Sequence, residues 1–453
     1  MPDQNPVSSY DADKNPVAAS NSHSLLTVTQ PADINDPSLM KSTLAISTRL
    51  NVQQTFAALQ YPNYRLWFFG QLVSLVGTWM QSTAQGYLIY ELTRSPAYLG
   101  YVGFAAGVPT LLFTLYGGVI ADRISRRTMM LFTQTTMMIL AFLLAGLVFT
   151  GSVQPWMIIV LAFLLGVANA FDAPARVSFV VELVDREDLT NGIALNSTMF
   201  NLATVIGPAV AGITYAALGP GWCFAINGIS FIGVIIALLL MHLKPIPINP
   251  QRSSVVDETK EGFRAVARNR TIFIMITGMG VLSLFGMSLM TLLPAWVSDT
   301  LNGNSKLYGL MLSGRGLGAL IAGLMIAYLG RYKVRGKLWT IGDLTLPLVI
   351  AAFALVRWLP LSLLLITLSG WSFMLQVNTA NAIVQTRIDD SLRGRVMGIY
   401  SLIFFGGMPI GALLVGGLAQ KIGEASTLLI CAAIMLVFAA CIYLRLPFLR
   451  HEG

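Results

Sequence analysis

The sequence has few charged side chains for its length. Asp, Glu, Lys and Arg together make up 11% of the 453 residues, whereas soluble domains usually carry about 25%. A soluble protein of this length could not cover its surface with so few charges, so lipid must be the solvent for much of the chain. The formal net charge of +8 does not indicate a nucleic-acid partner, because the basic residues lie between apolar runs and not on one soluble domain.

Cysteine and histidine are also scarce. Cys223, Cys431 and Cys441 all lie inside apolar runs and form no CxxC pair, which argues against a disulfide framework or a zinc site. The three histidines are far apart, and no phosphate-binding Gly-rich loop with a Lys is present. An ATP-driven pump or an intramembrane metalloprotease therefore lacks its parts, and the sequence predicts neither an enzyme nor a bound metal or cofactor.

Long apolar runs dominate the rest of the chain. Apolar residues other than Gly account for 55% of the sequence, and a membrane-spanning helix needs about 20 mostly apolar residues in a row. Twelve such spans are predicted near residues 66–90, 97–121, 128–150, 155–178, 191–217, 221–242, 271–297, 307–330, 338–356, 360–384, 395–419 and 424–446. The predicted fold is an all-α membrane protein with twelve transmembrane helices in two pseudo-symmetric six-helix bundles.

These spans divide the chain into four parts. Residues 1–60 begin with a stretch rich in Ser, Asn, Asp and Pro and have no apolar core of signal-peptide form, so they are predicted to be a disordered cytoplasmic tail. Residues 61–243 and 271–453 are the two predicted bundles. The polar segment 244–270 joins them, and helical spacing from Asp257 to Arg268, with Phe263 and Val266 on one side, predicts an amphipathic linker helix.

The basic residues indicate the orientation of the spans. If the N-terminus is inside, 24 of the 29 Lys and Arg residues lie in cytoplasmic segments. Only Arg94, Lys306, Arg357 and Lys421 then lie outside, and Arg315 lies within a span. Cytoplasmic loops carry an excess of basic residues, and moving the count by one span would destroy this alternation. Both termini are therefore predicted to be cytoplasmic.

Gly and Pro recur at equivalent places in the two halves. The fifth span carries Gly207, Pro208 and Gly212, and the eleventh, which is the fifth of its half, carries Pro409 and Gly411. We expect these residues to form a helix-packing motif, because small residues let membrane helices approach closely. Two related bundles around a central path are also what alternating access requires.

The loop after the second span reads Gly118-Val-Ile-Ala-Asp122-Arg123-Ile-Ser125-Arg126-Arg127. It resembles the signature between helices 2 and 3 of the major facilitator superfamily, G-x-x-x-D-R-x-G-R-R in outline, with Ser125 in place of the later Gly. Positive-inside anchoring explains part of the cations. The resemblance implies that the motif also acts in gating. Asp122 would face the positive N-terminal end of the eleventh helix and latch the two halves when the carrier faces outward.

Further motifs resemble one bacterial branch of this superfamily, that of enterobactin-exporter-like and macrolide-efflux proteins. They are Phe171 to Arg176, Glu182 to Val184, Glu187 to Leu189, Ala194 to Ser197, and Gly207-Pro208, the last resembling the helix-5 motif of antiporters. The resemblance implies a secondary carrier in the bacterial inner membrane. Such a carrier would export a siderophore-like or hydrophobic toxic compound as a monomer, using the proton gradient. Import, uniport-like flux and a non-transporting scaffold or sensor are the alternatives.

Asp172 and Arg176 are an i, i+4 pair near the inner end of the fourth span, and Asn169 shares their helix face. A local ion pair that stabilises the helix end is the favoured interpretation. The alternative is a charge relay in which Asp172 is a protonatable coupling group.

Asp343 is the second acid inside a predicted span. It lies a turn or two inside the ninth span, where Lys337 or Arg335 could pair with it, and it is also a candidate for charge relay. The helix-4 motif of the superfamily often carries an Arg within the membrane, but no cation precedes Gly166 here. The resemblance therefore does not assign coupling to such a residue.

Neutral amide side chains recur inside the spans, where they cost free energy unless they face a partner or a wet cavity. In the tenth span Asn378, Asn381 and Gln385 share one helix face, which is predicted to point inward. Substrate contacts and helix-packing hydrogen bonds explain them equally well. The remaining candidates for the substrate cavity are Gln81, Gln85, Asn169, Asn196 and Asn201.

Arg315 is the least expected residue of the spans. It lies about eight residues into the eighth span, roughly 12 Å from the outer end at a rise of about 1.5 Å per residue. A cation at this depth costs several kcal/mol unless it is paired or hydrated. It either extends outward toward Asp299 or Glu91, or lines the cavity and attracts an anionic or carboxylate-bearing substrate.

Overall fold

The computed structural model describes residues 56–121, 124–242, 255–329 and 334–445, with every side chain except those of 114–121, 255–259 and 445. The first long helices of these ranges are α3 (Pro62–Thr93), α4 (Pro96–Ala121), α5 (Arg126–Phe149), α6 (Pro155–Leu183), α7 (Leu189–Leu218) and α8 (Pro220–Leu240). Helix α9 (Val255–Arg268) follows in the predicted linker.

The second part of the chain begins with a segment in which ordinary and wide helical turns alternate. Helices α10 (Arg270–Val281) and α11 (Ser288–Ala295) are each followed by a π-helical segment, η2 (Leu282–Gly286) and η3 (Trp296–Thr300) respectively. The remaining helices are α12 (Ser305–Leu329), α13 (Arg335–Leu355), α14 (Leu359–Arg387), α15 (Asp390–Ile422) and α16 (Glu424–Arg445). The described residues contain no strand.

Eleven helices of the described part are long and apolar enough to cross a membrane, with Arg270–Thr300 counted as one. The chain is therefore a multi-pass membrane protein. Helix α3 has sufficient length, with 32 residues, but is not among the eleven. Its buried Gln71, Gln81 and Gln85 make it more polar than the eleven apolar helices, and this polar helix corresponds to the first predicted span.

Helix boundaries follow from local signals in the sequence. Pro begins α3, α6 and α8, at the position where the missing N–H costs nothing. The Oγ of Ser125 accepts a hydrogen bond from the backbone N of Thr128 at 3.2 Å. The residue that departs from the superfamily signature therefore caps the start of α5. Gly219 has a φ of 92°, which favours Gly, and the chain reverses there between α7 and α8.

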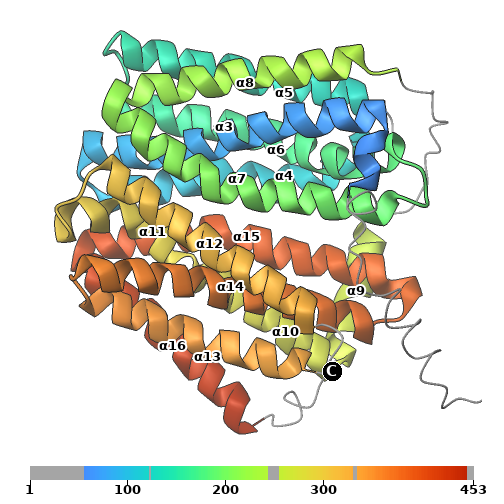
Figure 1. Ribbon diagram of the computed structural model, residues 1–453. Coiled ribbons are helices and arrows are strands. Elements are labelled where there is room, and N and C mark those ends of the chain that lie inside the picture. Colours follow the sequence, from blue (N-terminus) through green and yellow to red (C-terminus); the bar gives the residue numbers. More distant parts are fainter. Residues whose placement is uncertain (1–55, 122–123, 243–254, 330–333, 446–453) are drawn as a thin grey trace, which may run out of the picture. The chain divides into compact units, whose positions relative to one another are not determined.

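The long helices pack as two groups, α3–α8 in blue to green and α10–α16 in yellow to red (Figure 1). Helices α4 and α15 pack against each other, as do α7 and α12, and these two pairs form the main contact between the groups. Small residues make the contact close. Gly100 of α4 lies against Ala412 and Gly416 of α15, and Gly309 of α12 lies against Gly212 of α7.

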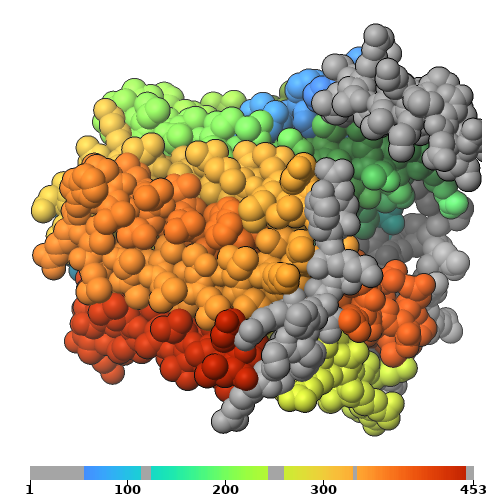
Figure 2. All heavy atoms as spheres, turned by 60° about the horizontal axis from the view of Figure 1, so that its bottom comes forward, coloured from blue at the N-terminus to red at the C-terminus, as the bar shows by residue number. Residues whose placement is uncertain are grey.

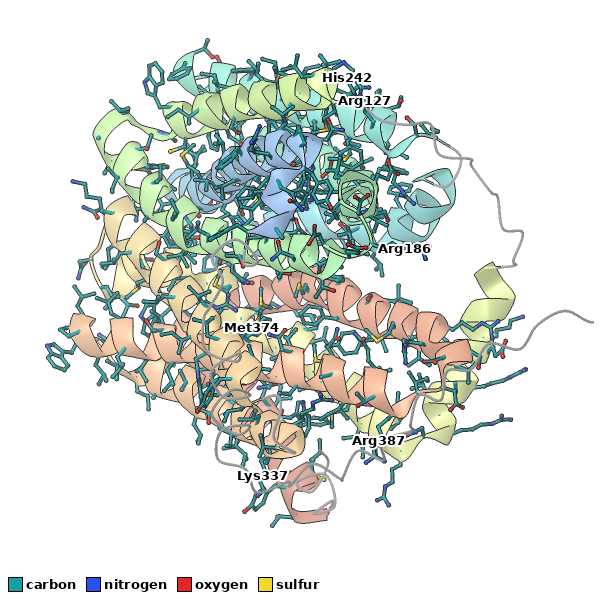
Figure 3. All side chains as sticks on the ribbon, turned by 45° about the vertical axis from the view of Figure 1, so that its right-hand side comes forward. Arg127, Arg186, His242, Lys337, Met374 and Arg387 are labelled. Carbon is teal, nitrogen blue, oxygen red and sulfur yellow. The ribbon has the colours of Figure 1, made fainter. Side chains whose placement is uncertain are left out.

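Because the helices alternate in direction, their connections lie at two ends. We call one the Asp299 end, where α3, α5, α7, η3, α13 and α15 end, and the other the Arg126 end, where α4, α6, α8, α12 and α14 end. The close contacts named above lie toward the Asp299 end. At the Arg126 end, Arg186 between α6 and α7 lies far from Arg387 of α14 (Figure 3).

The linker helix α9 packs on the start of α15, and Figure 2 shows it in yellow-green beside orange-red. Gly262 faces the backbone of Arg395, Val266 is buried, and Glu261 forms an ion pair with Arg395 at 2.8 Å. Phe263 is 48% exposed. Of the two residues predicted on one side of this helix, Val266 is therefore packed and Phe263 is not. The packed face runs from Gly262 to Val266, which are one turn apart.

The predicted tail, residues 1–60, lies outside the described residues except for 56–60. In that remainder, Ala57–Gln60 form a 3-10 turn, η1. The backbone N of Ala58 donates to Asn191 Oδ1 at 2.9 Å, and the Tyr61 hydroxyl donates to Asp188 at 2.9 Å. The hydrogen bond to Asp188 raises the pKa of Tyr61 to about 12, so the hydroxyl stays a donor. Residues 57–60 are thus anchored at the start of α7 and not disordered.

Candidate functional site

Two neighbouring cavities lie between the two groups of helices. The larger, of about 520 Å³, is lined by α3, α4, α6 and α8 of one group and by α11, α12 and α15 of the other. The smaller, of about 210 Å³, is lined by α3 and α7 on one side and by α11, α12 and α14 on the other. Ser82, Met290 and Tyr308 line both, so we treat the two as one central cavity. Met374 of α14 marks the smaller part (Figure 3).

Neutral amides line the larger part of the central cavity. Gln81, Gln85 and Asn169 all lie on its wall, as the sequence suggested for a cavity. Asn227 of α8 joins them and donates to Gln81 Oε1 at 2.7 Å, and the Asn169 amide donates to the backbone oxygen of Leu165 at 3.1 Å. Sequence reasoning missed Asn227, although an Asn with Ser230 one turn later in the otherwise apolar α8 was a usable signal.

Not every predicted amide reaches the central cavity. Asn201 lines the smaller part. Asn196, Asn378 and Asn381 line neither part, and the amide of Gln385 donates to Asn381 Oδ1 at 2.5 Å. That bond lies within α14, so within the described residues these amides show neither a contact with the central cavity nor a hydrogen bond to another helix.

Arg315 of α12 lines the smaller part of the central cavity. Its guanidinium carbon lies 4.9 Å from the centre of the Phe373 ring, and its Nη2 lies 3.7 Å from the sulfur of Met287. With its guanidinium at these positions, Arg315 does not extend to Asp299 or Glu91, which bind Tyr90 and Arg94, and Tyr215, respectively. A buried cation over an aromatic face gains about 2 kcal/mol, which is less than the cost of an unpaired charge at such a depth.

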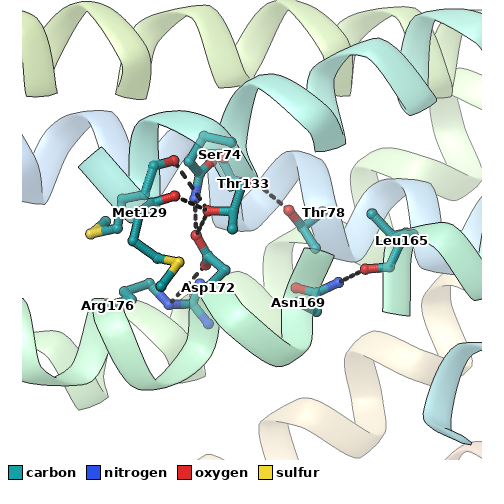
Figure 4. A network of polar contacts seen from close by, with 10 residues as sticks. Ser74, Thr78, Met129, Thr133, Leu165, Asn169, Asp172 and Arg176 are labelled. Atoms are coloured by element: carbon teal, nitrogen blue, oxygen red, sulfur yellow. Dashed lines mark hydrogen bonds and ion pairs between the residues drawn. The ribbon is translucent and has the colours of Figure 1, made fainter. Parts of the chain in front are cut away.

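Asp172 is the centre of a polar network between α5 and α6 (Figure 4). Its Oδ1 accepts hydrogen bonds from Thr133 Oγ1 at 2.8 Å and from Gln134 Nε2 at 3.0 Å. Its Oδ2 lies 3.8 Å from Arg176 Nε, and its side chain is 1% exposed. The ion pair expected from the i, i+4 spacing is present. Because both oxygens are engaged, the contacts favour a structural role for Asp172.

Asp343 lies in a different environment. Its side chain is 7% exposed, and it forms no ion pair or hydrogen bond within the described part of the chain. The pairing suggested with Lys337 or Arg335 is therefore wrong. Neighbouring Gly342 packs against α14 at Ser372, so Asp343 lies inside the second group and not on the wall of the central cavity.

The gating motif lies only partly within the described residues. Asp122 and Arg123 are outside them, and Gly118 is described only by its helical backbone in α4. Arg126 binds Glu182 of α6 at 2.6 Å, and Arg127 donates to the backbone oxygen of Leu239 of α8 at 3.0 Å. Arg127 lies near His242 in Figure 3. These two cations therefore tie the start of α5 to α6 and α8.

The Asp299 end holds a polar cluster that sequence reasoning did not assemble. The Tyr90 hydroxyl of α3 donates to Asp299 Oδ2 of η3 at 2.5 Å, and Arg94 lies 3.6 Å from Asp299 Oδ1. Ser95 donates to Gln420 of α15 at 2.5 Å. These contacts join the two groups of helices, whereas the Tyr215–Glu91 hydrogen bond lies within the first group.

The Gly and Pro residues of the predicted packing motif lie at helix crossings. Gly207 faces Trp79 of α3, and Gly212 faces Ser305 of α12. The carbonyl oxygen of Pro208 lies against Gly309, as Pro409 lies against Gly107 of α4. Gly411 lies against Leu284 of η2. A side chain at any of the three motif glycines would push helices apart.

The central cavity has the chemistry of a binding site. Its walls carry amides, hydroxyls, thioethers, aromatic rings and one guanidinium. The described residues also contain no cluster of three or more His, Cys, Asp or Glu that could hold a metal ion. A cavity whose walls come from both bundles of a multi-pass membrane protein is the arrangement of a secondary transporter of small molecules.

The chain belongs to the transmembrane secretion effector family of the major facilitator superfamily, which it matches over residues 53–452. It is 23% identical over 391 residues to the staphyloferrin A transporter of Staphylococcus aureus, covering 86% of this chain and 96% of that protein. It is 25% identical over 395 residues to macrolide efflux protein A of Streptococcus pyogenes, covering 83% of this chain and 96% of the relative.

The enterobactin exporter EntS of Escherichia coli is 25% identical over 401 residues, covering 86% of this chain and 93% of that protein. These relatives confirm the branch that the sequence motifs indicated. The fold is also that of the nucleoside transporter NupG, whose crystal structure superposes with a TM-score of 0.68 at 15% identity over 84% of this chain and 98% of NupG. The protein is thus a transporter and not an enzyme.

Proposed function

We propose that this protein exports a small organic molecule across the bacterial inner membrane by alternating access, driven by proton antiport. The observation that carries the proposal is the central cavity, because α3–α8 and α10–α16 both supply its walls. The polar α3 is then the twelfth membrane helix, and both termini are cytoplasmic. The Asp299 end faces outward and is closed, so the described conformation faces the cytoplasm.

The substrate class rests on the relatives and on the cavity. Two of the relatives are named as siderophore transporters and one as a macrolide efflux protein. A cavity of about 520 Å³, extended by the smaller part, falls within the usual range for sites that bind small organic molecules. A siderophore-like or hydrophobic toxic compound is therefore the proposed cargo.

The experiment that tests the proposal is uptake of candidate compounds into everted membrane vesicles, with and without a pH gradient that is acidic inside. An exporter driven by proton antiport should accumulate its cargo only when the gradient is present, and a protonophore should abolish the accumulation. Uptake at the same rate with and without the pH gradient would indicate uniport-like flux. Deleting residues 1–55 should leave uptake intact, whereas a scaffold that works through the tail would lose its partner.

Asp343→Asn is expected to lower gradient-driven transport at least tenfold while exchange of cargo across the membrane continues. A buried carboxylate without a partner can take up and release a proton as the surrounding helices move, and Asn cannot. Uptake with a pH gradient and counterflow without one should be compared in the same vesicles. Glu187→Gln, an equivalent change at an exposed acid, is the control. Equal loss of both transport modes would contradict the coupling role.

Asp122→Asn tests the gating role that the superfamily motif implies. The variant should be produced at normal levels but transport several-fold more slowly, because an amide loses most of the attraction of a carboxylate for a helix N-terminus, which is about 0.3–1 kcal/mol. Transport rates should be normalised to the amount of protein in the membrane. Undiminished transport by the well-produced variant would count against a latch.

A further inference from the structure

Arg315 is the only charged side chain on the wall of the central cavity, as far as the described residues go. Within the same ranges, no acidic side chain faces the cavity from any helix that lines it. The rest of the wall can donate and accept hydrogen bonds but carries no charge. A ligand in the cavity therefore meets one positive group and no negative one from the described part of the chain.

The neighbours of the guanidinium leave its charge uncompensated. They are the Phe373 ring at 4.9 Å and the Met287 sulfur at 3.7 Å, neither of which is an anion. Three arginines elsewhere in the described part have a carboxylate partner: Arg126 pairs with Glu182, Arg176 with Asp172 and Arg94 with Asp299. Arg315 differs from them because no carboxylate of the described residues pairs with it, and its side chain lines the cavity.

The fold holds Arg315 in place without such a partner. Gly370 of α14 packs directly on it, since a Cβ there would clash with the Arg315 carbonyl oxygen and come within 3.0 Å of its Cγ. Gly318 in turn packs on the backbone of α14 at Thr367. The crossing of α12 and α14 thus fixes the start of the side chain, and the Phe373 ring orients its end.

Aromatic side chains line the same part of the cavity as this cation. Trp79, Phe200 and Phe373 all line the smaller part of the cavity, and the rings of Trp79 and Phe200 lie 5.9 Å apart. Most of the neutral amides line the larger part of the cavity, whereas Arg315 lines the smaller part. A molecule that fits this distribution has a negative group, an apolar or aromatic part beside it, and neutral polar groups further away.

We infer that the central cavity is an anion-selective substrate site in which Arg315 binds a carboxylate of the cargo. Guanidinium and carboxylate groups match in geometry and charge, and the low dielectric of the cavity strengthens their attraction. An organic amine of the same shape meets a like charge and is rejected. This inference rests on the proposed function in taking the central cavity as the path of the cargo, and it selects organic anions over cationic drugs.

The test compares three probes that share one ring system and differ in charge: 1-naphthaleneacetate, 1-naphthaleneacetamide and 1-naphthalenemethylamine. Binding to the full-length protein in detergent is followed by fluorescence at constant ionic strength. The acetate should bind at least tenfold more tightly than the amine, with the acetamide between them. Arg315→Gln should remove this order, and Arg315→Lys should keep it with weaker binding. Arg65→Gln, the same change at an exposed arginine, should leave the order unchanged.

A second measurement does not depend on the choice of probe. Because Arg315 has no counter-charge among the described residues of the empty protein, Arg315→Gln should leave the melting temperature unchanged or raise it. A fall of several degrees would show that Arg315 is paired for stability and would overturn the inference. Tighter or equal binding of the amine would also overturn it, whatever the transport result. Conversely, Arg315-dependent binding of the acetate without gradient-driven uptake would support the anion site and contradict the proposed carrier function.

Discussion

Replacing Gly309 by Leu is expected to abolish transport and leave the protein folded. A Cβ at this position would clash with the carbonyl oxygen of Pro208 and lie 3.0 Å from the Cα of Gly212. Both residues belong to α7, so the clash lies between the two groups of helices and not inside either one. The added side chain would hold the Asp299 end apart, and alternating access requires that end to close.

The measurement pairs vesicle transport with chemical labelling. Transport by the Gly309→Leu variant should fall at least tenfold, and a cysteine placed at Ser82 should react with a membrane-impermeant maleimide added from the Asp299 side. The native cysteines are replaced beforehand. Gly323→Leu is the matched control, because Gly323 lies on the same helix and a Cβ added there would meet no atom within 4 Å. Normal transport by Gly309→Leu would refute the closure.

The second large effect is expected for stability. Asp172→Ala removes the carboxylate that Thr133, Gln134 and Arg176 share. Loss of one partner from a buried ion pair costs about 3–5 kcal/mol, and the buried amide of Gln134 would lose the carboxylate oxygen that accepts its hydrogen bond. We expect the melting temperature of the full-length protein to fall by roughly 5 °C or more.

Asp172→Asn and Glu187→Ala complete this test. The amide of Asn can still accept from Thr133, so the first variant should lose less stability than Asp172→Ala. Glu187 is an exposed acid of the same region, and its removal should have little effect. If Asp172→Asn keeps full stability but loses all pH-gradient-driven transport, Asp172 is a coupling group and the structural role is refuted.

Much of the fold was predictable because lipid imposes a simple rule on sequence. Spans must be apolar and about 20 residues long, so runs such as 128–150 and 221–242 correspond closely to α5 and α8. Hydropathy describes α3 less well, because its glutamines face protein and cavity instead of lipid. The π-helical turns of η2 and η3 were not predicted, since an extra residue in a turn leaves no mark on an apolar pattern.

The candidate site was harder to predict, since helix periodicity identifies a polar face but not its neighbour. The spacing of Asn378 and Asn381 correctly placed them together, yet α14 does not turn that face to the central cavity. Gln81, Gln85 and Asn169 had the same kind of signal and do reach it. The contact of Tyr90 with Asp299 joins residues 209 positions apart, and nothing local in the sequence indicates it.

The segment Arg270–Thr300 is mechanically unlike its counterpart α3. Helix α3 runs unbroken from Pro62 to Thr93 and can move as one rigid helix. The second-half segment has wide turns on both sides of α11, and Pro294 removes a further backbone hydrogen bond. The part of the cavity wall that carries Met290 and Thr291 can therefore bend at the π-helical segments before and after α11. If the central cavity is the path of the cargo, as proposed, bending of this wall lets it accept cargoes of different bulk while the opposite wall keeps its shape.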